Sequence, residues 1–257
     1  MHPLLFNIGS LPVHTYGFLV ALGFLAAVFT VRTLAIRAKL DVEKTLDMVF
    51  WLLLMGLLGA RILFIITKLD YFLAEPGAIF RVWEGGLVFL GGVLLAAPFG
   101  IWYTYRNHLP AWKTADVLMP GLTINHMFGR FGCLAAGCCY GKPTGTGFGV
   151  RLDSDLVDPA YRGILLHPTQ LYEAGGLLVL FLGLLWVQKH KSFDGQTALT
   201  YFIAYPIIRS IVEVYRGDLI RGFVIDKVLS TSQFISIVIL VIAAGFLQYR
   251  LKQVRAA

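Results

Sequence analysis

The sequence has few charged side chains for its length. Of 257 residues, 14% are charged and 57% are hydrophobic, and the mean hydropathy is +0.72. A soluble globular domain carries a larger charged fraction, so this composition excludes that class. It predicts one multi-pass membrane domain over residues 1–257, with no separate soluble module. The first segment lacks a basic region and a small-residue cleavage site, which predicts a retained span and not a signal peptide.

The sequence also lacks the motifs of common soluble enzymes. It contains no Walker loop, GxSxG elbow, HExxH pair or dinucleotide-binding fingerprint. Although the net charge is +7, no basic stripe is interleaved with aromatic residues, which argues against a nucleic-acid partner. Only three cysteines are present, and their odd number and clustering argue against a disulfide framework.

Seven apolar segments are visible, and each is near the roughly 20 residues that a helix needs to cross the hydrocarbon core. They cover residues 15–31, 46–67, 87–105, 115–136, 168–187, 195–214 and 230–248. The predicted fold is therefore all-α, a polytopic bundle of seven transmembrane helices. The fourth segment is the least apolar because it contains Asn125, His126 and Arg130, and we expect it to line a cavity.

The charges of the loops predict the orientation. Half of the 22 Lys and Arg residues lie in four short alternate loops, at 31–45, 104–114, 188–193 and 249–257. The positive-inside rule then puts the N-terminus outside and the C-terminus in the cytoplasm. The long loops 68–86 and 137–167 fall outside, and the second, rich in Gly, Pro and Asp, is predicted to form a small folded head.

Three arginines fall inside the apolar segments: Arg61, Arg130 and Arg209. A cation at membrane depth is unfavourable unless it faces a protein interior or a polar cavity. Each is therefore a candidate for binding an anion, and lipid phosphate is the anion most available in a membrane. Structural alternatives stay open, because Arg209 has Glu213 at i+4 on the same helical face and Arg61 could snorkel to the outer interface.

The fourth segment also raises the question of a metal site. On a helix, His126, Arg130 and Cys133 share one face because they fall at i, i+4 and i+7. One histidine and three cysteines are possible zinc ligands, but the adjacent pair Cys138 and Cys139 and the absence of a CxxC pair disfavour a tetrahedral site. We therefore expect no metal, and we interpret the cysteines as small packing residues beside a cavity.

A polar heptapeptide, His167-Pro168-Thr169-Gln170-Leu171-Tyr172-Glu173, joins the predicted head to the fifth segment. Pro168 suits a first helical turn, which places Glu173 one turn inside, where a carboxylate needs a partner. We interpret the heptapeptide as a set of polar residues that joins the head to the bundle, with direct catalysis as the alternative. Tyr16 and Tyr205 add hydroxyls that could face the same cavity, although each also suits the interfacial aromatic belt.

Taken in order, these motifs resemble the phosphatidylglycerol–prolipoprotein diacylglyceryl transferase family nearly end to end. The matching motifs are Tyr16-Gly17, Gly59-Ala60-Arg61, Trp83-Glu84-Gly85-Gly86, Gly129 to Gly141, the heptapeptide, and Arg209 to Arg216. The resemblance implies seven spans, an outer N-terminus and an outward head in the cytoplasmic (inner) membrane of a bacterium. These expectations agree with the topology derived from the loops.

The resemblance also implies a reaction. The diacylglyceryl group of phosphatidylglycerol moves to the thiol of the lipobox cysteine in a preprolipoprotein signal peptide, and glycerol-1-phosphate is released, with no cofactor. Arg130 and Arg209 match the family's essential arginines, and cations suit a phosphodiester whose charge grows as the C–O bond breaks. We expect further substrate contacts from polar or close-packed residues of the same region: Arg61, Gly141, His167, Tyr205 and Glu213.

The sequence departs from the family pattern at three positions. Cys133 replaces a common Asn, Cys138 an acidic residue, and Leu90 a histidine proposed as the base. Leucine cannot take a proton, which leaves three candidates for the base: His126, Tyr16 and Glu84. Three other readings stay open: a divergent paralogue with another lipid donor or acceptor, an anion transporter, and a metal-sensing membrane protein built on His126 and the cysteines.

Overall fold

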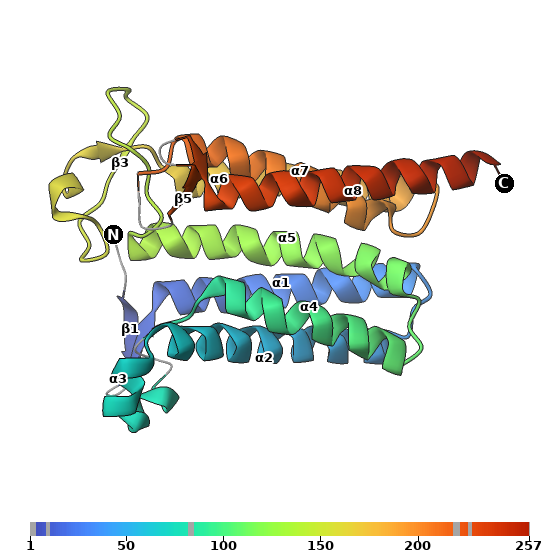
Figure 1. The fold of residues 1–257 in the computed structure, drawn as a ribbon, viewed down its shortest axis with the longest axis horizontal. Helices are drawn as coiled ribbons and strands as arrows, with labels where there is room; N and C mark the ends of the chain where they lie inside the picture. Colours follow the sequence, from blue (N-terminus) through green and yellow to red (C-terminus); the bar gives the residue numbers. More distant parts are fainter. Residues whose placement is uncertain (1–3, 9–10, 82–84, 218–221, 226–227, 257) are drawn as a thin grey trace. The chain divides into compact units, whose positions relative to one another are not determined.

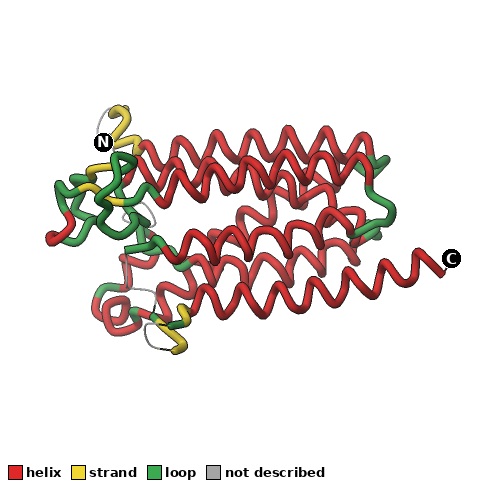
Figure 2. Tube along the Cα trace, turned by 90° about the horizontal axis from the view of Figure 1, so that it is seen from above, coloured by secondary structure: helices red, strands yellow, loops and turns green. Residues whose placement is uncertain are grey.

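The computed structural model describes residues 4–8, 11–81, 85–217, 222–225 and 228–256, and helices make up most of them (Figure 2). The long helices, labelled in Figure 1, are α1 (Thr15–Arg37), α2 (Val42–Thr67), α4 (Phe89–Arg106), α5 (Ala111–Ala136), α6 (Thr169–His190), α7 (Gln196–Val214) and α8 (Thr231–Ala256). Each coincides with one of the apolar segments found in the sequence. The predicted helical class is therefore confirmed.

Five of the described helices are long and apolar enough to cross a membrane, namely α1, α2, α6, α7 and α8. Helices α4 and α5 fall outside this group. Helix α4 contains Pro98 and ends in Arg106, and α5 carries polar residues along its length. Several membrane-length apolar helices in one chain make this a multi-pass membrane protein.

The chain divides into two compact units, one of residues 31–114 and one of residues 1–30 with 115–257. In the 31–114 unit, α2 and α4 meet at Gly59 and Gly91. A Cβ added at Gly59 would lie 2.3 Å from the Gly91 carbonyl oxygen, and one at Gly91 would lie 2.2 Å from that of Gly59. Only glycine permits this backbone contact, which is typical of helix pairs in membranes. The loop after α2 contains α3 (Leu69–Ala74) and η1 (Pro76–Phe80), which the sequence had not predicted.

In the other unit, α7 packs against both α6 and α8, and α1, α5 and α6 share an apolar core. The core comprises Ala27, Ile124, Met127, Ala174 and Leu177. At Gly23 an added Cβ would lie 2.7 Å from the Cβ of Phe128, so α1 and α5 are in close contact there. This packing directs the polar residues of α5, α6 and α7 toward the interior of the unit.

Three two-stranded antiparallel sheets complete this unit. They pair β1 (Leu4–Ile8) with β2 (Leu11–His14), β3 (Val150–Arg151) with β4 (Leu165–Leu166), and β5 (Phe223–Ile225) with β6 (Leu229–Ser230). The sequence had predicted none of these strands, which lie toward one end of the helices (Figure 2). Segment 137–167 contains β3, β4 and the short helix η3 (Pro159–Tyr161). It has its own apolar cluster of Tyr140, Leu152, Val157 and Leu166, so it is a small folded element.

Candidate active site

Charged side chains from three helices meet inside the unit of residues 1–30 and 115–257. Helix α5 contributes His126 and Arg130, α6 contributes Glu173, and α7 contributes Arg209 and Glu213. The i, i+4 spacing puts each pair on one face of its own helix. The packing of α5, α6 and α7 then gathers the two pairs around the single carboxylate of α6.

Glu173 lies at the centre and is 1% exposed. Its Oε1 is 3.0 Å from Arg130 Nη2, and its Oε2 is 3.6 Å from Arg209 Nη1. The Tyr205 hydroxyl donates a hydrogen bond to Oε1 at 3.2 Å. A buried carboxylate is tolerated when it is paired in this way. The expectation that Glu173 has a partner is confirmed, whereas its position between the two arginines had not been predicted.

The cluster carries more positive than negative charge. Arg209 Nη2 also lies 2.5 Å from Glu213 Oε2, and Arg216 Nε lies 4.0 Å from the same oxygen. Three guanidinium groups therefore face two carboxylates, and three minus two leaves a net charge of +1 when His126 is neutral. A site with this balance, enclosed by apolar helices, favours a monoanion such as a phosphodiester.

Several arginine nitrogens of the cluster make no hydrogen bond to a described residue. Arg130 Nε and both Nη atoms of Arg209 are buried without a hydrogen-bond partner among the described residues. The Arg209 nitrogens face Glu173 and Glu213 as ion pairs whose geometry is not that of a hydrogen bond. Because buried donors are normally satisfied, and guanidinium groups match phosphate oxygens, the chemistry of these donors suits a phosphate group.

The ring of His126 is already engaged. Its Nε2 lies 3.1 Å from Arg130 Nη2 and 3.7 Å from Glu173 Oε1. A guanidinium group can only donate, so Nε2 accepts this hydrogen bond and its lone pair is occupied. The ring also packs edge-on against Tyr205, with the ring centroids 5.2 Å apart. This geometry favours a role for His126 in positioning Arg130 over a role as the base.

Gly141 and His167 brace the segment that carries Arg216. The Gly141 amide donates to the His167 carbonyl at 3.0 Å, and Gly141 forms an antiparallel bridge with Arg216. A Cβ at Gly141 would lie 2.6 Å from the His167 carbonyl oxygen, so glycine is required there. The His167 ring contacts Tyr172 and Tyr215. The two predicted substrate contacts are thus found at a structural joint beside the cluster.

The remaining base candidates lie elsewhere. Tyr16 is in the first turn of α1, 45% exposed, and a Cβ at Gly132 would be 2.9 Å from its Cδ2. Glu84 is outside the described residues. Leu90, at the second position of α4, is 51% exposed.

Arg61 is held differently from the arginines of the cluster. It lies in the 31–114 unit and is buried. Its guanidinium donates to five backbone carbonyls, those of Ala78, Ile79, Arg81, Gly85 and Gly86. A guanidinium group has five N–H donors, and here all of them bind the backbone. Arg61 therefore holds residues 78–81 and 85–86 against α2.

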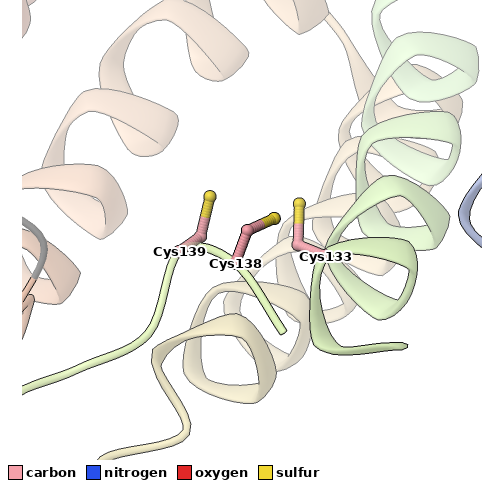
Figure 3. Close-up of side chains that lie close together, drawn as sticks. All are labelled: Cys133, Cys138 and Cys139. Atoms are coloured by element: carbon pink, nitrogen blue, oxygen red, sulfur yellow. The ribbon is translucent and has the colours of Figure 1, made fainter. Parts of the chain in front are cut away.

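At the C-terminal end of α5 the chain brings its three thiols together. The sulfur atoms of Cys133, Cys138 and Cys139 all lie within 4.8 Å of one another (Figure 3). The pKa of the Cys139 thiol is lowered because its sulfur accepts hydrogen bonds from the other two thiols and lies near the positive charge of Arg216. Spacing in the sequence had not predicted this convergence. His126 does not belong to this cluster of three cysteines; its ring is hydrogen-bonded to Arg130.

Comparison with known proteins gives consistent matches over the whole length. The family model described as prolipoprotein diacylglyceryl transferase matches residues 3–249. The chain is 34% identical to phosphatidylglycerol–prolipoprotein diacylglyceryl transferase 2 of Clostridium perfringens over 255 residues, which cover 99% of this chain and 97% of the relative. Phosphatidylglycerol–prolipoprotein diacylglyceryl transferase of Clostridium tetani is 34% identical over 242 residues, 94% of this chain and 95% of the relative. That of Dehalococcoides mccartyi is 32% identical over 255 residues, 98% and 94% of the two chains.

Proposed function

The chain belongs to the prolipoprotein diacylglyceryl transferase family, and from this membership we propose that it transfers the diacylglyceryl group of phosphatidylglycerol to the lipobox cysteine of preprolipoproteins. The cysteine sulfur attacks the glyceryl carbon and forms a thioether, while the C–O bond to phosphate breaks and glycerol-1-phosphate leaves. The observation that carries the proposal is the buried cluster with a net charge of +1 and open arginine donors.

Arg130 and Arg209 would bind the phosphodiester. Negative charge moves onto the leaving phosphate as the bond breaks, so donors that are fixed beforehand stabilise the transition state more than the ground state. Glu173 fixes them, because its carboxylate lies between the two guanidinium groups. It also offsets part of their charge, which makes the burial of two cations tolerable.

The attacking sulfur must be a thiolate. A model thiol has a pKa of about 8.5, so a small fraction is ionised near neutral pH, and the positive cluster favours that form. We assign His126 to positioning Arg130, and we retain Tyr16 and Glu84 as candidates for the proton acceptor. Tyr16 is the better supported of the two, because its ring lies against Gly132, on the helix that carries Arg130.

The lipid and its surroundings suggest roles for the other predicted residues. A cavity of about 310 Å³, lined by Tyr172, Ile211, Val212 and Tyr215, flanks the end of α7 that bears Glu213. Its apolar side chains suit part of an acyl chain. Tyr205 and Glu213 orient the arginines, Gly141 and His167 brace Arg216, and Arg61 serves the fold of its own unit.

We propose that all seven long helices cross the cytoplasmic (inner) membrane of a bacterium as a single transferase domain, residues 1–257. The N-terminus is outside, the C-terminus is cytoplasmic, and segment 137–167 forms the outer (periplasmic) head. The basic short loops support this orientation. So does the placement of β1 and of the C-terminal end of α8 at opposite ends of the helices of their unit (Figure 1).

The test is transfer by the purified protein. We would incubate it in detergent with phosphatidylglycerol and a lipobox peptide, and we expect the mass of the peptide to rise by one diacylglyceryl group. The same peptide with serine in place of cysteine should not change. An Arg162→Lys variant is a matched control, because Arg162 forms a partly exposed ion pair with Asp155, away from the cluster; it should react like the parent.

The outcome also separates the proposal from its alternative. Leu90 stands where the family pattern has a histidine, which keeps open a divergent paralogue with a different lipid donor or acceptor. Transfer from another phospholipid, with none from phosphatidylglycerol, would establish that paralogue. An unchanged peptide with every phospholipid offered would overturn the transferase assignment.

A further inference from the structure

The three thiols form a compact group at the end of α5. Cys133 is in the last turn of the helix, Cys138 and Cys139 follow after Gly137, and the three sulfur atoms lie within 4.8 Å of one another (Figure 3). None of the three is in a disulfide; Cys133 is buried, and Cys138 and Cys139 are half-buried. The transferase mechanism uses none of them.

The backbone of the turn produces this convergence. Gly137 has φ +77°, the Gly137 amide donates to the Leu134 carbonyl, and the Cys138 amide donates to the Cys133 carbonyl at 3.1 Å. These bonds form a Schellman motif, in which a left-handed glycine folds the chain back over the last helical turn. Cys139 also has a positive φ, +62°, which is uncommon for a residue with a Cβ. Together, the left-handed residues Gly137 and Cys139 bring the side chain of Cys139 next to that of Cys133, six residues earlier in the sequence.

The first turn of α6 then clamps the backbone of the same cysteines. The side-chain amide (Nε2) of Gln170 donates to the Cys138 carbonyl and the Thr169 hydroxyl donates to the Cys139 carbonyl, each at 2.7 Å. Thr169 and Gln170 are both buried. Because the cysteine backbones are fixed by another helix, the sulfur atoms are held in place before any ligand binds, which is what a metal site requires.

We propose that Cys133, Cys138 and Cys139 bind one Cu(I) ion through three thiolates. Metal–sulfur bonds of about 2.3 Å place the sulfurs of a three- or four-coordinate site roughly 4 Å apart, so the present separations need shifts below about 1 Å. Binding releases the thiol protons to solvent and leaves the oxidation state of the metal unchanged.

The ligand set favours Cu(I) over zinc. Thiolate is the soft ligand that selects Cu(I), zinc and iron–sulfur clusters. Structural zinc sites take four protein ligands, and the group found in the described chain contains no histidine or carboxylate to supply a fourth. A monovalent ion with three thiolates leaves two negative charges. Arg130 acts electrostatically on Cys133 and Cys139, and Arg216 acts on Cys139, so positive charge lies next to two of the three ligands.

The test uses the full chain purified in detergent with a thiol-free reductant. Cu(I) is titrated in competition with a chromogenic Cu(I) chelator, and we expect one equivalent to be withdrawn from it. Each of Cys133→Ser, Cys138→Ser and Cys139→Ser should weaken binding by more than the roughly 10–100-fold that loss of an outer-shell partner costs. X-ray absorption of the loaded protein should show three sulfur neighbours at about 2.2–2.3 Å.

A Thr169→Val variant, which keeps every thiol and removes one clamp, should weaken binding within that 10–100-fold range. Gel filtration and circular dichroism show whether each variant is folded. Parental affinity in the triple serine variant would mean adventitious binding by other side chains, and parental affinity in any single variant would mean that the site is not three-coordinate. Tighter binding of Zn²⁺ than of Cu(I) would also overturn the assignment. No phospholipid or peptide is present, so this result is independent of the transferase activity.

Discussion

Asp116 near the start of α5 and Glu173 near the start of α6 are both buried carboxylates of the same unit, 0% and 1% exposed. Their partners differ. Asp116 accepts hydrogen bonds from Lys191 Nζ at 2.6 Å, from the Gly195 amide at 2.8 Å and from the Ala198 amide at 2.9 Å. Asp116 therefore caps α7 from a neighbouring helix, where an anion also interacts favourably with the helix dipole.

The cluster around Glu173 has more cations than anions, and most of the ion-pair distances to Glu173 are longer than the hydrogen bonds of Asp116. Its nearest nitrogens, from Arg130, Arg209 and His126, lie at 3.0, 3.6 and 3.7 Å. Asp116 is paired by three short hydrogen bonds from donors of the protein itself. The Glu173 cluster keeps buried arginine donors that make no hydrogen bond to a described residue, and it keeps a net positive charge, although burying such groups is unfavourable. We therefore assign the proposed phosphate site to the Glu173 cluster, where the hydrogen bonding of buried charge is incomplete.

The largest expected effect tests whether Asp116 stabilises the fold. Asp116→Ala leaves Lys191 and two amides without their buried acceptor, and we expect a loss of about 3–5 kcal/mol of stability. Unfolding in detergent, followed by circular dichroism, measures it. Asp194→Ala is the matched control, because Asp194 binds the same lysine from a half-exposed position and should cost less than about 1 kcal/mol. If Asp116→Ala instead kept its stability and lost turnover, the contrast between the two carboxylates would fail.

The second effect tests whether the arginines around Glu173 contribute to turnover. Arg130→Lys and Arg209→Lys keep the charge but lose the planar fork that binds two phosphate oxygens. We expect kcat/KM to fall about 10²–10³-fold, the usual loss for one preorganised donor in a transition state, with little change in unfolding. Peptide mass is measured over time, with Arg162→Lys as the control. Near-parental turnover in either variant would remove that arginine from the phosphate site.

The sequence predicted more of the helices than of the contacts between them. Long apolar runs identify helices because a membrane leaves the backbone few other conformations, and each predicted segment is a helix here. The i, i+4 rule also found the pair Arg209 and Glu213, since that rule acts within one helix. It could not find the contacts of Glu173, because they depend on how three helices pack.

The loops were predicted least well. The spacing of the cysteines argued against a shared site, yet left-handed residues at Gly137 and Cys139 bring the sulfurs together. The strands of the sheets are too short to show a periodic pattern. Arg61 was predicted as a candidate anion ligand, with snorkelling as the alternative, because it is a cation in an apolar segment. In the structure its guanidinium donates to carbonyls of a later loop, and no local rule identifies these contacts.

His126→Gln sharpens the description of the Glu173 cluster. Glutamine can still accept a hydrogen bond from Arg130, so a positioning role predicts a loss of about tenfold or less that is uniform with pH. A general base would contribute about 10²–10⁴-fold. Its loss would be greatest at low pH and would recover as the peptide thiol ionises unaided. The pH profile of kcat/KM from pH 6 to 9 distinguishes the two, and a recovery at high pH would return His126 to the list of bases.

The smallest expected effect is the pH dependence of the stability that the ion pair between Lys191 and Asp116 contributes. Partial burial lowers the pKa of Lys191, but its hydrogen bonds to Asp116 and Asp194 raise it more, so this pKa lies above its ordinary value. A raised pKa means that the charged lysine stabilises the folded state fully below the unfolded pKa of about 10.4. That stabilisation is lost as pH rises through the higher folded pKa. Lys191→Met should therefore lower stability by about 1 kcal/mol at pH 8, and the difference from the parent should shrink toward pH 11. Melting curves of the two proteins over this range measure it. A difference that stays constant would mean that the lysine acts through packing and not through its charge, and Asp116 would then depend on the α7 amides alone.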